Sequence, residues 1–376
     1  MVIAPLVVIA APLLIGLMPL LLLVIIIVAS FIPRRFRWPR ALLIALVYLL
    51  WDALLLLVLF ALWIATGFGW KIRSSWSIRA HYAVAALALR VLFWVCRGVL
   101  RVRVLTEGAQ QTDDSTTAAS FRQMLRPGTP VIVASRHAGP GDSFVLMHAL
   151  LNHVKRMPRV VVKDTLQWDP AIDVLLNRLP SRFISPTGFT PPTGGSARSV
   201  QRPANAHVAE KAITELVDGL GTADAFVIFP EGGNFTPSRR ITRIDRLRES
   251  GKEALALRAE ALQHVLAPQP RGLYAAIEAA PLADVVFIAH SGLDDLSSVR
   301  DLWRALPMEK RITLHAWRVP RADVPVARDD QMVWLYDWFT RIDGWIDRGS
   351  HPAPKSGPQA AQEQEQTAQS DDAAQE

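Results

Sequence analysis

A histidine and an aspartate five positions apart, His137 and Asp142, follow a short apolar run at residues 130–135 and precede another apolar stretch. Between them, Gly139 and Gly141 permit a tight turn that returns the carboxylate towards the imidazole. A carboxylate bonded to one ring nitrogen fixes the tautomer and leaves the other nitrogen as a base. Asp142 is also suited to cap the following helix, and the two roles are compatible. The pair therefore predicts general-base chemistry.

The spacing of this pair is a weak signal by itself, because the chain contains nine histidines. His290 and Asp295 repeat the same spacing, and short motifs of this kind arise by chance. Only the surrounding sequence can separate the two pairs.

Two further motifs follow His137-x4-Asp142 along the chain. They are Arg182-Phe-Ile-Ser185 and Phe229-Pro-Glu-Gly232, the second at the end of an apolar run. In order and rough spacing, the three motifs resemble the lysophosphatidate (1-acylglycerol-3-phosphate) acyltransferase family of glycerolipid acyltransferases. The resemblance extends from about Val131 to His290. Residues 264–272 further resemble the lysocardiolipin-type branch of these enzymes.

The resemblance implies roles for individual residues. His137 would be the general base and Asp142 its orienting partner, while Glu231 and Gly232 would shape the acceptor site. Acyl-CoA would be the co-substrate, and neither a metal nor a cofactor is expected. Cys96 is the only cysteine, so the chain has no internal disulfide, and Cys96 is a poor candidate for a covalent acyl carrier.

Two arginines of the family pattern are missing from this chain. Ser185-Pro186 stand where the family has Asp-Arg, and Gly233-Asn234 stand where it has Thr-Arg. Because the family arginines are thought to bind the acceptor phosphate, either other cations replace them or the acceptor headgroup differs. The candidate replacements are Lys163, Arg182, Arg239 and Arg240.

The predicted reaction transfers a fatty acyl group from acyl-CoA to the hydroxyl of a lysophospholipid. The leading acceptor is 1-acylglycerol-3-phosphate, which would give phosphatidate in phospholipid biosynthesis or remodelling. Two alternatives stay open: a non-catalytic lipid-binding membrane protein of the same fold, and a lipid ester hydrolase. The sequence has no Gly-x-Ser-x-Gly motif to support the hydrolase. Despite a net charge of +7, it has no zinc-ligand spacing or nucleic-acid motif, so the expected partner is a lipid bilayer.

Short apolar runs alternate with helix-like stretches between residues 130 and 345. Five runs predict buried strands, at residues 130–135, 160–163, 225–229, 285–289 and 312–318. Helices are expected at 142–153, 171–179, 207–220, 239–264 and 332–345. Residues 107–117 and 186–203 are polar or rich in Pro and Gly, and are expected to be loops. The alternation predicts an α/β fold, a layered mixed sheet with flanking helices.

The amino-terminal part is much more apolar than the rest. Val2–Ile32 contains no charge, and Ala41–Trp70 contains only Asp52. A helix needs about 20 apolar residues to span a bilayer core, and both segments are longer. These residues predict a membrane-anchoring helical hairpin that precedes the α/β domain.

The orientation of the two segments is ambiguous. Arginines at 34–40 place the connector on the cytoplasmic side, whereas basic residues at 71–79 place the far end of the second segment there as well. Two full crossings cannot satisfy both, and a hairpin in a single leaflet would. In either arrangement we expect a membrane protein whose catalytic domain lies on the cytoplasmic face.

A third stretch, His81–Val104, places arginines at helix-like intervals among apolar residues, which favours contact with anionic lipid headgroups. The carboxyl-terminal residues are polar and acidic, with too few apolar groups to fold alone. We therefore divide the chain into a membrane anchor of two hydrophobic helices (1–70), a basic amphipathic juxtamembrane helix (71–105), an acyltransferase domain (106–349) and a disordered acidic tail (350–376).

Overall fold

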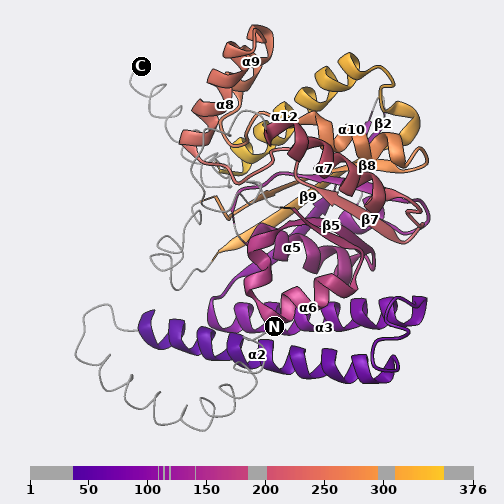
Figure 1. Ribbon diagram of the computed structural model, residues 1–376. Coiled ribbons are helices and arrows are strands. Elements are labelled where there is room, and N and C mark those ends of the chain that lie inside the picture. The colour runs from indigo at the N-terminus through magenta and orange to yellow at the C-terminus, as the bar shows by residue number, and fades with distance from the viewer. Residues whose placement is uncertain are drawn as a thin grey trace, which may run out of the picture.

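The computed structural model describes residues 37–108, 110–112, 115–117, 120–139, 141–184, 201–294 and 310–350. Within these residues, helices cover both faces of a seven-stranded sheet, and two long helices lie side by side along one side of this body (Figure 1). The first apolar segment, most of the expected loop at 186–203 and nearly all of the expected tail lie outside the described residues.

The main sheet has the strand order β1-β9-β8-β4-β7-β5-β6. All neighbouring strands are parallel except β8 and β9, which are antiparallel. The strand bounds are β1 Arg103–Gly108, β4 Val131–Ser135, β5 Met157–Lys163, β6 Ser181–Ile184, β7 Asp224–Ile228, β8 Asp284–Ser291 and β9 Arg311–Val319. The five expected strands are present, and the mixed α/β fold is confirmed.

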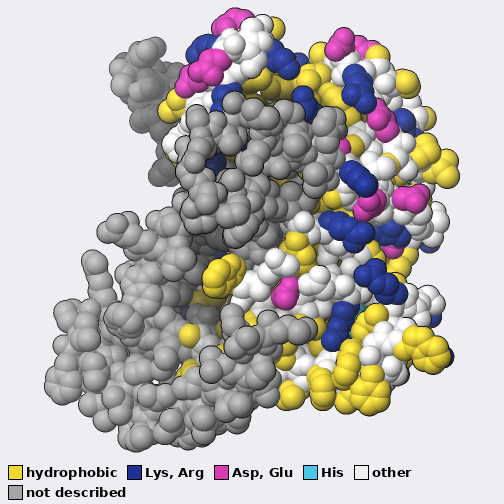
Figure 2. Space-filling view, viewed as in Figure 1, with side chains coloured by type: hydrophobic (Ala, Val, Ile, Leu, Met, Phe, Trp, Pro, Cys, Tyr) yellow, Lys and Arg dark blue, Asp and Glu magenta, His cyan; other side chains and the backbone are white. Residues whose placement is uncertain are grey.

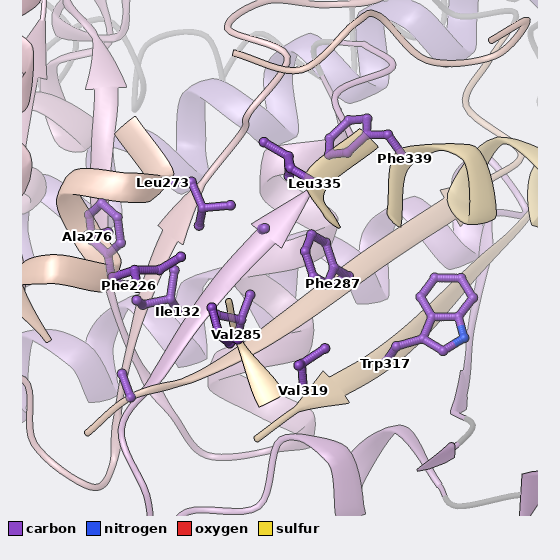
Figure 3. Packing of buried hydrophobic residues seen from close by; sticks show 14 of the residues in the cluster. Ile132, Phe226, Leu273, Ala276, Val285, Phe287, Trp317, Val319, Leu335 and Phe339 are labelled. Atoms are coloured by element: carbon purple, nitrogen blue, oxygen red, sulfur yellow. The ribbon is translucent and has the colours of Figure 1, made fainter. Parts of the chain in front are cut away.

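The central strand β4 explains why the sheet could be detected from sequence. All five of its residues are buried, as expected for a parallel strand covered on both faces. One face packs on α5 (Asp142–His148), η1 (Ala149–His153) and α4 (Phe121–Met124). The other packs on α7 (Gln201–Val217), α10 (Pro270–Ala279) and α12 (Arg328–Ser350), and Figure 3 shows Phe287 of β8 within this cluster. Phe287 also stacks on Trp338.

The remaining elements are short connections at the ends of the strands. Their bounds are β2 Gln110–Thr112, β3 Ser115–Thr117, η2 Asp164–Trp168, α6 Pro170–Arg178, α8 Pro237–Glu249, α9 Glu253–Ala261 and η3 Arg321–Asp323. Two expectations need correction here. The single helix expected at 239–264 is divided into α8 and α9 by a turn at Gly251, which has a φ of +70°. The loop expected at 107–117 contains the end of β1 and the β2–β3 hairpin.

The long helices are α2 (Arg37–Ala65) and α3 (Ser75–Val99). They correspond to the second apolar segment and to the expected juxtamembrane helix, so these two together form the helical hairpin that the structure describes. The juxtamembrane helix was expected to extend to residue 105, but it ends at Val99. Arg101 has a φ of 56°, which breaks the helix, and the chain then enters β1.

The hairpin is fastened to the body along its inner face. Asp52 is 3% exposed and its Oδ1 accepts a hydrogen bond from the backbone N–H of Ala171 at 3.2 Å, at the start of α6. Arg178, at the other end of α6, donates to the carbonyl of Leu59 at 2.6 Å. Tyr82 of α3 donates to the carbonyl of Pro158 at 2.9 Å. Asp52, the one acidic residue of the second apolar segment, therefore contacts α6 within the protein.

The outer face of the hairpin is apolar and exposed. Its exposed large side chains include Leu54, Leu57, Phe60, Trp70, Trp76, Leu87 and Trp94. Figure 2 shows hydrophobic side chains gathered over the end of the hairpin where α2 is joined to α3. Both helices are long and apolar enough to cross a membrane. This is weak support for membrane association, because length and composition alone do not distinguish such helices from core helices.

Candidate active site

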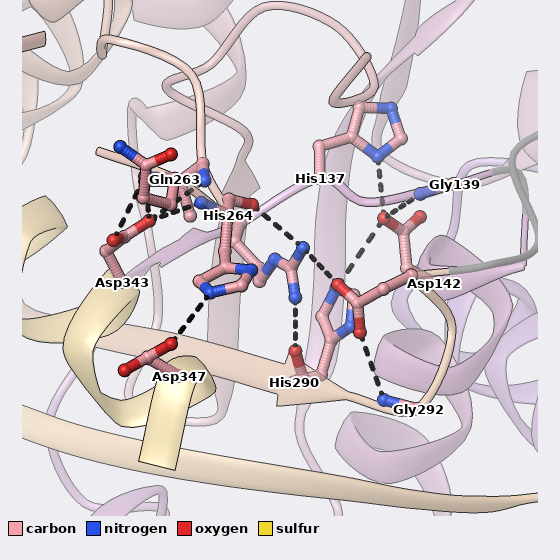
Figure 4. Close-up of polar contacts among 12 residues, drawn as sticks. His137, Gly139, Asp142, Gln263, His264, His290, Gly292, Asp343 and Asp347 are labelled. Atoms are coloured by element: carbon pink, nitrogen blue, oxygen red, sulfur yellow. Dashed lines mark hydrogen bonds and ion pairs between the residues drawn. The ribbon is translucent and has the colours of Figure 1, made fainter. Parts of the chain in front are cut away.

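His137 and Asp142 meet just beyond the carboxyl end of β4 (Figure 4). His137 Nδ1 lies 2.8 Å from Asp142 Oδ2, and the same oxygen accepts a hydrogen bond from the backbone N–H of Gly139 at 3.2 Å. Asp142 is the first residue of α5, so the turn and the helix start bring the carboxylate back to the ring. The contact expected from the spacing is therefore formed.

The environment of Asp142 keeps its carboxyl group ionised. Burial alone would raise its pKa, but the adjacent side chains of His137 and His290 outweigh burial and hold the pKa well below its usual value. Asp142 is 1% exposed, whereas the side chain of His137 is 12% exposed. The carboxylate is thus enclosed, and the imidazole reaches the open side of the site.

His290 lies beside the same carboxylate, which the sequence analysis did not foresee. In the sequence, His290 and Asp295 repeat the spacing of His137 and Asp142, but Asp295 lies outside the described residues. Because β8 pairs in parallel with β4, the end of β8 places His290 Nε2 3.6 Å from Asp142 Oδ2. Only this strand pairing brings the two together, so no local sequence signal could have revealed the contact.

Arg136 connects the loops around the site. Its guanidinium donates to the carbonyls of His290 and His264, at 2.6 and 3.1 Å. It also forms an ion pair with Asp294 at 2.7 Å. Arg136 is almost wholly buried, and sequence reasoning missed it because its partners lie in distant segments.

Glu231 lies beneath His137. Its Oε1 accepts a hydrogen bond from the backbone N–H of His137 at 2.6 Å, and Oε2 accepts one from the backbone N–H of Leu266 at 2.7 Å. Burial raises its pKa to about 7, although Arg136 and these hydrogen bonds act in the opposite direction. Glu231 therefore positions the loop that carries His137, because each of its side-chain oxygens accepts a hydrogen bond from a backbone N–H.

A cavity of about 1290 Å³ opens beside His137. Its lining extends from the hairpin across the carboxyl ends of the strands to α8, α10 and α12. Apolar lining residues on the hairpin side include Trp51, Leu55, Leu89, Phe144, Met147 and Leu175. The cationic lining residues are Arg243, Arg246, Lys252, Arg271 and Arg328. The cavity therefore offers both an apolar and a cationic wall to a ligand near His137.

Of the two residues expected to shape the acceptor site, Gly232 lines this cavity and has a φ of +63° that favours glycine, whereas Glu231 is fully buried and is not among the lining residues. The predicted phosphate-binding arginines lie elsewhere. Arg182 is half-exposed and pairs with Glu215 at 3.5 Å. None of Arg182, Arg239 and Arg240 is among the residues that line the cavity.

The contacts of the last two arginines explain their position. Arg239 is exposed and donates to the carbonyl of Asn234 at 3.1 Å. Arg240 donates to the carbonyls of Leu262 and Glu260, both at 2.5 Å, which fastens α8 to α9. Lys163 is the last residue of β5, and its side chain is outside the described part of the structure. Their roles in substrate binding stay predictions.

Among the residues that the structure describes, no group of three or more His, Cys, Asp or Glu side chains is arranged to hold a metal ion. The chemistry that the site supports with its own residues is proton transfer at the imidazole of His137.

Comparison with known proteins supports an acyltransferase. Residues 117–291, which include His137, Asp142, Glu231 and His290, match the protein-family model described as Acyltransferase. The match supports an acyltransferase domain in this part of the chain, in agreement with the family that the motifs resemble. The lysocardiolipin-type branch stays a prediction.

Among solved structures, the chain is similar to the crystal structure of the 1-acyl-sn-glycerophosphate (LPA) acyltransferase, PlsC, from Thermotoga maritima. The sequence identity is 12%, the TM-score is 0.42, and the match covers 81% of this chain and 98% of the other. A similarity this distant does not identify a substrate. No curated protein matches the chain in a sequence search.

Proposed function

We propose that the protein is a membrane-associated acyltransferase that moves a fatty acyl group from acyl-CoA to the hydroxyl of a lysophospholipid. The observation that carries the proposal is the His137–Asp142 pair beside a cavity with an apolar and a cationic wall. An acyl chain needs the first wall, and the phosphates of acyl-CoA or of the acceptor need the second. The leading acceptor is 1-acylglycerol-3-phosphate.

In this mechanism, Asp142 holds the Nδ1–H of His137 and leaves Nε2 as the base. The acceptor hydroxyl gives its proton to Nε2 while its oxygen attacks the thioester carbonyl carbon. The tetrahedral intermediate then collapses, the C–S bond breaks and the acyl group remains on the acceptor oxygen. The coenzyme A thiolate leaves and takes up the proton from the imidazolium, which restores the base. No covalent acyl-enzyme is needed.

The cationic wall takes the place of the two family arginines that this chain lacks. Arg243 is fixed by its hydrogen bonds to the carbonyls of Glu231 and Ala267, at 2.6 and 2.7 Å. Arg246 and Arg271 are exposed to the cavity and can turn towards a phosphate. We propose that these residues, rather than Arg182, bind the anionic part of a substrate.

The hairpin would hold the site at the membrane. Its inner face is fastened to α6 and β5, while its outer face is apolar. This arrangement favours two helices that lie in one leaflet, with the catalytic domain on the cytoplasmic face. A lysophospholipid in that leaflet could then enter the cavity along its apolar wall.

The proposal is tested with the full chain in detergent or vesicles, radiolabelled acyl-CoA and a panel of lysophospholipids with different headgroups. Transfer of label to one or more lysophospholipids supports it. Release of free fatty acid from a diacyl lipid without acyl-CoA would instead identify a hydrolase. Lipid binding with neither activity would identify a non-catalytic lipid-binding protein.

A further inference from the structure

We infer that His290 is a positioning residue for the reaction proposed above, which holds the Asp142 carboxylate on the side opposite His137. The inference rests on the proposed function. His290 Nε2 lies 3.6 Å from the same Oδ2 oxygen that contacts His137 Nδ1 at 2.8 Å (Figure 4). Two histidines, from the ends of two adjacent strands, thus share one carboxylate oxygen.

The buried environment of His290 would suit an apolar side chain, so the polar ring needs an explanation other than core packing. It is 2% exposed, and neither ring nitrogen has a hydrogen bond within the described part of the chain. The other buried residues of β8 are Val285, Val286, Phe287, Ile288 and Ala289. A buried polar ring is unfavourable unless a partner compensates it, and the Asp142 carboxylate is an acceptor near its Nε2. A shift of a few tenths of an ångström closes this contact to a hydrogen bond.

The surroundings of His290 favour a neutral ring. Burial lowers its pKa, the adjacent Arg136 guanidinium acts in the same direction, and Asp142 and Asp294 act against them. A neutral ring donates one N–H to Asp142 without cancelling its negative charge. Asp142 then keeps its charge for His137 while its rotation is restricted.

His290 acts through Asp142 and not on the substrate. It is not among the residues that line the cavity, whereas His137 is. Its own position is fixed by Arg136, which donates to the His290 carbonyl at 2.6 Å. The predicted consequence is a loss of rate without a loss of substrate affinity when the donor is removed.

The test uses two substitutions at position 290 and one matched control. His290→Leu removes the donor, whereas His290→Gln keeps an N–H donor at the place of Nε2. His315→Leu is the control, because His315 is also buried, pairs with Ala289 on the adjacent strand and packs against Trp317 with its ring tilted. All variants are made in the full chain, and their thermal unfolding is measured alongside activity.

We expect His290→Leu to lower kcat by about 10- to 100-fold and to change the KM of either substrate by less than about twofold. His290→Gln should recover most of the rate, and His315→Leu should stay within about twofold of the unmodified protein. In an Asp142→Asn background, His290→Leu should cause no further loss. An unchanged kcat in His290→Leu, no recovery in a folded His290→Gln, or an equal loss in the Asp142→Asn background would each overturn the inference.

A second readout does not depend on transferase activity. With histidines labelled with nitrogen-15, the proton on His137 Nδ1 gives a signal that is assigned by its loss in His137→Ala. His290→Leu should shift this signal, and His315→Leu should not. If the unmodified protein transfers no acyl group but the shift is present, the proposed function fails while the contact between His290 and Asp142 stands. If the signal does not move, the inference fails whatever the activity.

Discussion

The two ends of the strands in the central sheet treat buried polar side chains in opposite ways. At the end where β4, β5 and β7 begin, Arg156 is wholly buried and all its contacts are satisfied. It donates five hydrogen bonds to backbone carbonyls, those of Leu125, Arg126, Thr129, Thr222 and Asp224. At the end where the strands finish, His137 is open to the cavity, and the ring nitrogens of His290 have no hydrogen bond to any described residue. At the beginnings of the strands, hydrogen bonds hold the turns in place. At their carboxyl ends, polar side chains stay free to react.

The comparison follows from the direction of the strands. In open α/β sheets, ligands bind beyond the carboxyl ends of the strands, where the loops that follow them converge. At the beginnings of the strands, the carbonyls of the turns need only hydrogen-bond donors. One guanidinium, which has five N–H donors, can serve several turns at once. Substitutions at the two ends should therefore separate activity from stability.

The largest expected effect is on activity at the carboxyl ends of the strands. His137→Ala removes the base and Asp142→Asn removes its orienting carboxylate, so each should lower kcat by about 1000-fold or more. Thermal unfolding should change little for His137→Ala, because its side chain faces the cavity. Activity is measured with labelled acyl-CoA and the preferred lysophospholipid. A fully active His137→Ala would show that the site is misassigned.

The opposite pattern is expected at the beginnings of the strands. Arg156→Met leaves five buried carbonyls without their donor and should lower the free energy of unfolding by about 3 kcal/mol or more. The kcat per folded molecule should stay within about threefold. Denaturant unfolding and activity of the same preparation check this. Arg126→Met, whose side chain is exposed, is the matched control and should change stability by less than about 0.5 kcal/mol.

The fold was predictable where burial leaves a continuous apolar run. Central strands such as β4 and β8 are covered on both faces, and their sequences show it. The two strands of the seven-stranded sheet that were not expected, β1 and β6, are its edge strands. In β1, Arg103 and Val104 mix charged and apolar side chains, so the run looks like the end of the amphipathic helix before it.

The site was predictable where its contacts are local in sequence. His137 and Asp142 are separated by one turn, so their types and spacing were enough to predict the contact. His290 reaches Asp142 only because β8 pairs with β4, and Arg156 meets its carbonyls only after three strands assemble. Neither fact is encoded in a local pattern. The cationic wall was missed for the same reason, because its residues come from separate helices.

Glu231 sharpens the comparison. It lies at the carboxyl ends of the strands, beside His137, but both of its side-chain oxygens have hydrogen-bond partners, as the donors of Arg156 do. Burial raises its pKa from an unfolded value near 4.5 to about 7, so the folded protein binds the proton more tightly than the unfolded chain. The stability of the protein should therefore fall as pH rises from about 4.5 to 7, by about 3 kcal/mol, and level off above that range. Glu231→Gln cannot titrate.

The measurement is the free energy of unfolding at several pH values for both proteins. The difference between the unmodified protein and Glu231→Gln isolates the titration of this one carboxyl group from the others. A difference that is constant from pH 4.5 to 8 would show that Glu231 keeps the same protonation state on folding. It would then be an ordinary structural carboxylate whose charge is stabilised by Arg136 and the two backbone N–H groups.

The smallest expected effect distinguishes two sets of arginines at the carboxyl ends of the strands. Arg271 lines the cavity, whereas Arg182 lies outside that lining and pairs with Glu215. If the cavity holds a phosphate, Arg271→Ala should raise the KM of the substrate that carries it by about tenfold, the loss of one charge-assisted contact. Arg182→Ala should change either KM by less than about twofold, because its ion pair is exposed.

The KM values for acyl-CoA and for the lysophospholipid are measured separately, which shows which substrate places its phosphate there. The reverse result, with a large change for Arg182→Ala and none for Arg271→Ala, would return phosphate binding to the position expected from the second motif.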